Sequence, residues 1–103
     1  MTEDDKRLRL DLNNPVFQQQ LFALSRQQQI QVLKALGKLS GLSWAQVYRD
    51  RGLHWEAIHS RKGPHGGRLY SLRMGKAFRG LAWREGDWLR LLSLHPDHDS
   101  AYH

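Results

Sequence analysis

Residues 68–94 read RLYSLRMGKAFRGLAWREGDWLRLLSL, and the stretch holds three apolar runs separated by two short turns. The runs cover residues 68–74, 77–84 and 88–94, and they carry the aliphatic and aromatic side chains that strands favour. Glycines at positions 75 and 86 mark connections of two or three residues, the usual length of hairpin turns. The stretch therefore predicts an antiparallel β meander.

The lengths of the two turns decide which side chains share a face of this meander. If the first turn spans residues 75–77, Arg73 pairs with Arg79, and like charges directly opposite each other indicate an anion between them. In this register one face carries Arg73, Arg79, Ser71 and Leu81, whereas Tyr70, Leu72, Met74 and Phe78 pack on helices. The second turn leaves two alternatives. Three residues send His95 to the arginine face, and two residues send it to the helix face.

A strand and two helices are expected before the meander. Leucines alternate with charged residues in residues 6–12, which is the period of a half-buried strand. Asn14 followed by Pro15 begins a helix that runs to about residue 24. Ser25 caps a second helix that forms a hairpin with the first. The apolar face expected for this second helix comprises Ile30, Val32, Leu33 and Leu36.

Ser43 and Gln46 form a capping box that opens a short third helix, and Gly52 is expected to close it. Its core-facing residues are expected to be Trp44, Val47 and Tyr48. Residues 53–58 predict a short strand or an extended segment, and residues 63–67 predict a loop because they are rich in glycine and proline. The chain thus predicts an α+β fold, with an N-terminal strand, a helical hairpin and a short third helix packed on an antiparallel β meander.

Length and composition support a single domain of residues 1–103, with residues 1–5 and 96–103 as candidates for flexible ends. The sequence contains no cysteine, which excludes disulfides, thiolate zinc sites and a cysteine nucleophile. No stretch has the form of a signal peptide or a membrane span, so we expect no membrane association and a cytoplasmic location.

Positive charge gathers in the second half of the chain. The net charge is +6, and residues 49–90 contain ten basic and four acidic side chains, a local excess of the same size. Such a basic stripe predicts binding to RNA or another polyanion. The candidate RNA-binding residues are Arg68, Arg73, Lys76, Arg84 and Arg90. Trp83 and Trp88 flank the last hairpin, where they either pack across the strands or stack on bases.

The element order and several motifs resemble the RelE/ParE toxin superfamily of bacterial toxin–antitoxin systems. In that family an arginine-bearing strand leads through a glycine turn to a second arginine strand, then to a hairpin and an apolar strand that runs into a C-terminal histidine or tyrosine. The matching residues here are Leu72-Arg73, Gly75, Phe78-Arg79, the turn at 85–87, and residues 95–102. The resemblance implies a RelE-like fold.

In the RelE branch the resemblance implies an endoribonuclease that inhibits translation by cutting mRNA on the ribosome. Cleavage there proceeds without metal or cofactor, by attack of the 2′-hydroxyl on the adjacent phosphate. Arg79 matches the phosphate-holding arginine, and Tyr102 matches a tyrosine that takes part in proton transfer. His95 and His98 lie where some members carry a catalytic histidine. The implied partners are RNA or the ribosome, and a cognate antitoxin.

The sequence departs from the family pattern at three positions. The paired lysines of the best-known RelE members fall on Leu69 and Ser71, and their terminal arginine falls on Pro96. A non-catalytic module that binds RNA, the ribosome or a protein is therefore an alternative, as is a ParE-like gyrase inhibitor. The terminal segment also contains His95, Asp97, His98, Asp99 and His103, but these residues form no fixed metal-binding motif, and we expect no metal site.

Overall fold

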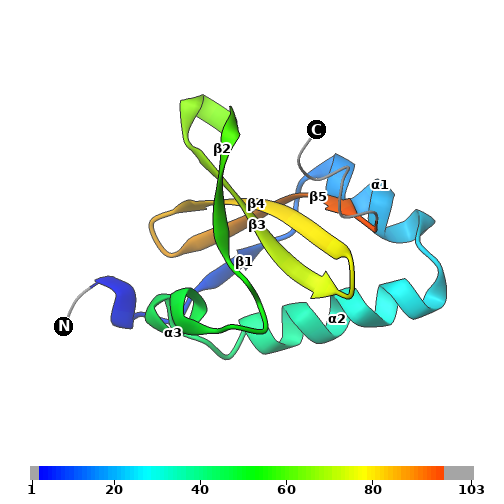
Figure 1. The fold of residues 1–103 in the computed structure, drawn as a ribbon, viewed down its shortest axis with the longest axis horizontal. Coiled ribbons are helices and arrows are strands. Elements are labelled where there is room, and N and C mark those ends of the chain that lie inside the picture. Colours follow the sequence, from blue (N-terminus) through cyan, green and yellow to red (C-terminus); the bar gives the residue numbers. More distant parts are fainter. Residues whose placement is uncertain (1–2, 97–103) are drawn as a thin grey trace.

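The computed structural model describes residues 3–96, in which helices cover one face of a five-stranded mixed sheet (Figure 1). The strands are β1 (Arg9–Asp11), β2 (Glu56–Lys62), β3 (Arg68–Gly75), β4 (Phe78–Glu85) and β5 (Trp88–His95). The helices are α1 (Pro15–Ala23), α2 (Arg26–Leu39) and α3 (Trp44–Arg49), and two 3-10 turns are η1 (Glu3–Asp5) and η2 (Pro64–Gly66). This architecture confirms the predicted α+β class.

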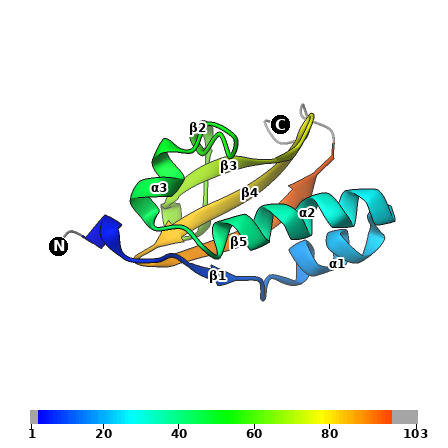
Figure 2. The same cartoon turned by 90° about the horizontal axis from the view of Figure 1, so that it is seen from below.

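The sheet has the order β1-β5-β4-β3-β2. Neighbouring strands from β2 to β5 run antiparallel and form the predicted meander, whereas β1 joins β5 in parallel at the other edge. The α1–α2 hairpin follows β1 in the chain and precedes the other strands. It lies against one face of the sheet (Figure 2). β2 crosses the other strands steeply, and its end with η2 projects from the body (Figure 1).

The main core lies between this sheet face and the helices. It combines side chains from every layer: Leu8, Phe17, Val32, Leu36, Leu39, Trp44, Val47, Leu72, Met74, Phe78, Ala82, Leu89, Leu91 and Leu94. The alternation expected for residues 6–12 is confirmed, since Leu8 is buried in this core and Leu10 and Leu12 pack against it. The predicted helix starts are also confirmed, because Asn14, Ser25 and Ser43 each cap a helix with their side chains.

Two expectations about buried helix faces are wrong. Ile30 and Leu33 are 46% and 62% exposed, because α2 turns Val32, Ala35, Leu36 and Leu39 towards the sheet instead. Tyr48 is 45% exposed, since α3 is only six residues long and already buries Trp44 and Val47.

Two boundaries also differ from the sequence expectation. β2 occupies residues 56–62 rather than 53–58, because residues 51–54 form a turn in which His54 has a φ of 49°. α3 ends at Arg49 before Asp50, whose carboxylate accepts a bond from the N–H of Leu53, and therefore ends before Gly52. Residues 3–5 form η1, since Asp4 pairs with Arg84 at 2.8 Å. Among the described residues, no helix is long and apolar enough to cross a membrane.

Candidate nucleic-acid interface

The sheet face turned away from the main core carries the candidate residues. Along β4, Phe78 and Ala82 belong to the main core, so the alternating positions Arg79, Leu81 and Trp83 point to the other side. We call this side of the sheet the arginine face. It has a small apolar cluster of its own, made by Ile58, Leu69 and Leu81 with Leu92 packed against them.

Arg79 lies on the arginine face near the start of β4, the middle strand of the sheet. It is 3% exposed, and its Nη2 donates a hydrogen bond of 3.1 Å to the hydroxyl of Ser71, which is itself fully buried. Its neighbours in register are Arg73 on β3 and His95 on β5. The predicted pairing of Arg73 with Arg79 is therefore confirmed. The turn is Lys76–Ala77 rather than residues 75–77, because an irregularity after Arg73 takes up one residue.

His95 reaches this face by a route that neither sequence alternative contained. Glu85 pairs with Trp88, so the second turn has two residues, which by simple alternation sends His95 to the helix face. The register then shifts between Leu81 and Ala82, where β5 accommodates one extra residue as a β-bulge. The bulge reverses the alternation, and His95 comes to lie opposite Arg79.

The surroundings of His95 favour its neutral form. Its Nε2 shares a hydrogen bond of 2.8 Å with the hydroxyl of Ser93. Burial lowers the pKa of His95 below its usual value of 6.5, and the positive charge of Arg61 lowers it further. A neutral imidazole beside a guanidinium can accept a proton near a bound anion. The strands thus bring together a cation, a hydroxyl pair and a candidate base.

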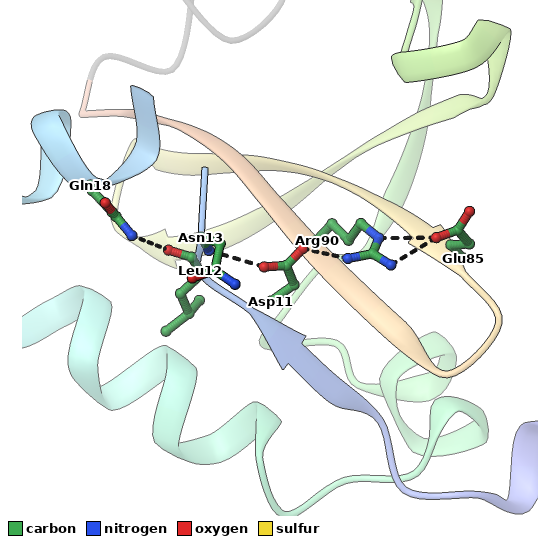
Figure 3. A network of polar contacts seen from close by, with 6 residues as sticks. All are labelled: Asp11, Leu12, Asn13, Gln18, Glu85 and Arg90. Carbon is green, nitrogen blue, oxygen red and sulfur yellow. Dashed lines mark hydrogen bonds and ion pairs between the residues drawn. The ribbon is translucent and has the colours of Figure 1, made fainter. Parts of the chain in front are cut away.

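The remaining candidate cations are spread over the molecule. Arg73 and Lys76 are exposed on β3 and in the turn after it, and Arg68 is exposed at the start of β3. Arg90 lies on the arginine face opposite Trp83, where Glu85 and Asp11 hold its guanidinium (Figure 3).

Arg84 lies apart from Arg79, on the helix side of the sheet. It pairs in register with Leu89 of the main core, and its guanidinium stands 4.2 Å from the ring centre of Trp44. It donates hydrogen bonds to Asp4 and to the hydroxyl of Tyr48. The structure therefore does not bring Arg84 together with the other candidates, and gives it a role in fixing η1 to α3.

The terminal candidates lie outside the described residues. Tyr102 and His98 belong to residues 97–103, as do Asp97, Asp99 and His103. Sequence reasoning missed two members of the site, Ser93 and Arg61. Ser93 carried a usable signal, since it lies two residues before His95 and so shares its face. Arg61 carried none, because β2 was expected to end before it.

The comparisons identify the fold. No protein-family model matches this sequence, and no curated protein matches it. Among solved structures, the chain is similar to the archaeal RelE–RelB complex from Pyrococcus horikoshii OT3, with a TM-score of 0.56 and 17% sequence identity. The similarity covers 89% of this chain and 94% of the other chain. The fold is RelE-like.

Within this RelE-like fold, the departures noted in the sequence acquire a structural meaning. Leu69 and Ser71 are 1% and 0% exposed, so both positions contribute to the packing of the arginine face. Lysine at position 69 would bury an ammonium group in the small apolar cluster, and lysine at position 71 would bury one beside Arg79; both are costly without a partner. Where the family pattern has lysines, this part of the arginine face therefore combines Arg79 and His95 with Ser71 and Ser93.

Proposed function

We propose that this chain is a RelE-like toxin that cleaves mRNA, in association with the ribosome, by attack of the 2′-hydroxyl on the adjacent phosphate. The observation that carries the proposal is the register of β4 and β5, in which Arg79 stands opposite His95 on the arginine face. A phosphate-binding cation next to a neutral base is what this reaction requires.

Each residue has a distinct role in the proposed reaction. His95, with its lowered pKa, accepts the proton of the 2′-hydroxyl. Arg79 and Arg73 stabilise the charge that develops on the phosphate oxygens, since guanidinium groups bind phosphate with two parallel bonds. Tyr102 or His98 donates a proton to the departing 5′-oxygen. Because Arg79 is only 3% exposed, the phosphate reaches its guanidinium only when neighbouring groups move aside.

The decisive experiment incubates the purified chain with mRNA in a translation extract and maps the cut ends. We expect cleavage that survives EDTA and leaves a 2′,3′-cyclic phosphate.

Arg79→Ala should slow cleavage about 10²-fold or more, as loss of one preorganised donor does. His95→Ala or Tyr102→Phe should slow it by about 10² to 10⁴ with little change in RNA affinity. Arg26→Ala, a change of an exposed arginine on α2, is the control and should cut at the normal rate. A folded Arg79→Ala variant with full activity contradicts the proposal.

The proposal includes a cognate antitoxin as partner. The similar solved structure is a RelE–RelB complex, which supports a protein partner for this fold. We propose that an acidic or apolar segment of the antitoxin covers the arginine face, because this most directly blocks the phosphate site. Charge reversal at Arg73 and Arg79 should then weaken the complex, and unchanged affinity in a co-purification assay argues against this placement.

A non-catalytic RNA-binding or ribosome-binding module is the second candidate function. The burial of Leu69, Ser71 and Arg79 favours it, since positions that carry cations in the best-known RelE members serve packing here. The same translation assay separates the two. A chain that binds RNA but never cuts it on translating ribosomes is the module. A ParE-like gyrase inhibitor would instead leave mRNA intact and block DNA supercoiling.

A further inference from the structure

A hollow lies on the arginine face near the β1 edge of the sheet, at some distance from Arg79. It has a volume of about 290 Å³, and Trp83 and Leu92 of the sheet line it. Its lining also includes Pro64 of η2, and Asn13 and Asn14 of the β1–α1 connection. A second hollow of about 550 Å³ shares Asp11, Asn13 and Arg90 with the first and extends to Trp88. Together they have the size of a small-ligand site.

Arg90 lines both hollows, and two carboxylates hold its guanidinium. Its Nη2 and Nε bond to the carboxylate of Glu85 at 2.8 and 3.2 Å, and its Nη1 bonds to Asp11 (Figure 3). Its guanidinium carbon lies 5.4 Å from the ring centre of Trp88 and 6.0 Å from that of Trp83. Two indole rings therefore flank one fixed guanidinium, and all three are groups on which nucleobases stack.

Polar groups for the edge of a base surround these rings. The backbone N–H of Asn13, and then the guanidinium of Arg90, lower the pKa of Asp11, so its carboxylate stays ionised and accepts hydrogen bonds. The side-chain amide of Asn13 offers both a donor and an acceptor. Gln18 donates to the carbonyl of Leu12 at 2.9 Å, which ties this connection to α1 (Figure 3).

The hollow also has a fixed relation to the proposed phosphate site. Arg79, Leu81 and Trp83 are alternate residues of one strand, so Arg79 and Trp83 lie on the same face about 13 Å apart along β4. Because the bulge lies in β5, it leaves this alternation of β4 undisturbed. One RNA strand can therefore contact both places while lying along β4.

We propose that Trp83 and Arg90, with Asp11 and Asn13, form a nucleobase-binding subsite for single-stranded RNA. This inference rests on the RNA binding in the proposed function and adds to it the place where a base is held. The base is unpaired, since only an unstacked base exposes its face to a protein ring. The subsite tolerates different bases because stacking does not read sequence.

The test measures binding, without cleavage, of the full chain to a short 2′-O-methyl RNA oligonucleotide by fluorescence anisotropy. Trp83→Ala should weaken binding about 5- to 150-fold, the range for loss of one stacked base, whereas Trp83→Phe should retain most of the affinity. Phe22→Ala removes an aromatic ring that is 76% exposed on α1, and it should bind like the wild type. The slope of affinity against salt should stay the same in Trp83→Ala, because stacking releases no counterions.

A scan of single abasic positions provides a second measure in the unaltered chain. One abasic position should weaken binding to the wild type as much as Trp83→Ala does, and it should cause no further loss in that variant. Unchanged affinity in a folded Trp83→Ala variant overturns the subsite, as does a scan without any sensitive position. These results do not depend on cleavage: a chain that binds through Trp83 and never cuts keeps the subsite and loses the nuclease proposal. A wild type that binds no RNA overturns both.

Discussion

Three arginines of the meander show that the strand position of a residue, more than its type, decides its role. Arg79 is buried among the arginine-face residues and bonds to a hydroxyl group. Arg84 lies on the opposite face, where Asp4 and the ring of Trp44 hold it. Arg90 is back on the arginine face but is bound by two carboxylates. The three arginines therefore differ in face and in the groups around them, although they lie on neighbouring strands.

The titration of His95 is a direct test of its surroundings. We expect an NMR titration to give a midpoint below 6.5, because burial and Arg61 both disfavour the charged ring. Since the unfolded chain then binds the proton more readily, the contribution of His95 to the free energy of unfolding is present above pH 6.5. It is lost as the pH falls through the lowered pKa. Arg61→Gln should move the midpoint upwards, and a midpoint at or above 6.5 in the wild type contradicts this account.

Ala77 offers a stability test independent of function. Its φ of 58° lies in the left-handed region, which costs a residue with a Cβ roughly 1–2 kcal/mol. Ala77→Gly removes this cost, but glycine loses more conformational entropy on folding, which destabilises the chain by about 0.5–1 kcal/mol. The free energy of unfolding should therefore rise by up to about 1 kcal/mol. Lys34→Gly, at an exposed position in the middle of α2, should lower it by about 0.5–1 kcal/mol. Urea denaturation of both variants gives the comparison, and a loss in Ala77→Gly contradicts the prediction.

At the scale of elements, local sequence patterns predicted the helix caps and the meander. They did not predict details of strand pairing that depend on distant residues. The pairing of Arg73 with Arg79 was predicted, but the structure reaches it through a two-residue turn and an irregularity after Arg73 rather than through a three-residue turn. The bulge in β5 was not, because residues 88–94 form an apolar run in which Leu91 and Leu92 suit either face. It exists because Leu92 packs on the small apolar cluster while Leu91 and Leu94 remain in the main core. The position of His95 thus depends on packing that no local pattern encodes.

The buried face of α2 and the place of β2 were mispredicted for a related reason. The apolar residues of α2 are numerous enough to support two faces, and contact with β3 and β4 selects the one that contains Val32 and Leu36. β2 has little alternation of its own, and its pairing with β3 determines its bounds. Tertiary contact overrides weak local preference in both elements.

The short helix α3 should depend strongly on its cap. The hydroxyl of Ser43 accepts a bond of 3.2 Å from the N–H of Gln46, whose side chain accepts one of 2.8 Å from Ser43 in return. A six-residue helix is unstable alone, so Ser43→Ala should lower the free energy of unfolding by about 1 kcal/mol. Ser60→Ala, an exposed change in β2, should have little effect in the same thermal melts. Equal stability of the two variants contradicts this view of α3.

At the scale of the whole molecule, charge and shape favour one side for RNA. The helices cover one face of the sheet, and Arg79 and Arg90 lie on the other. Arg61 is close enough to His95 on that face to lower its pKa. The projecting end of β2 adds basic residues around a hollow of about 340 Å³, namely His59, Arg61, Lys62 and Arg68. An RNA strand lying along β4 would pass from the region of Arg79 to that of Trp83. The cations Arg61, Lys62 and Arg68 border this path.

The salt dependence of RNA binding distinguishes this directed charge from a merely basic protein. Each neutralised phosphate contributes about −0.7 to the slope of log affinity against log salt on single strands. Arg61→Glu and Arg26→Glu change the net charge equally, yet only Arg61 lies on β2 near His95, whereas Arg26 begins α2. If Arg61 contacts a phosphate of the bound RNA, Arg61→Glu should weaken binding and make the slope shallower by about 0.7. Arg26→Glu should leave the slope unchanged, because Arg26 lies on α2 and changes only the long-range electrostatic potential at the RNA. Identical slopes for the two variants would show that RNA senses the total charge of the chain rather than a surface on the arginine face.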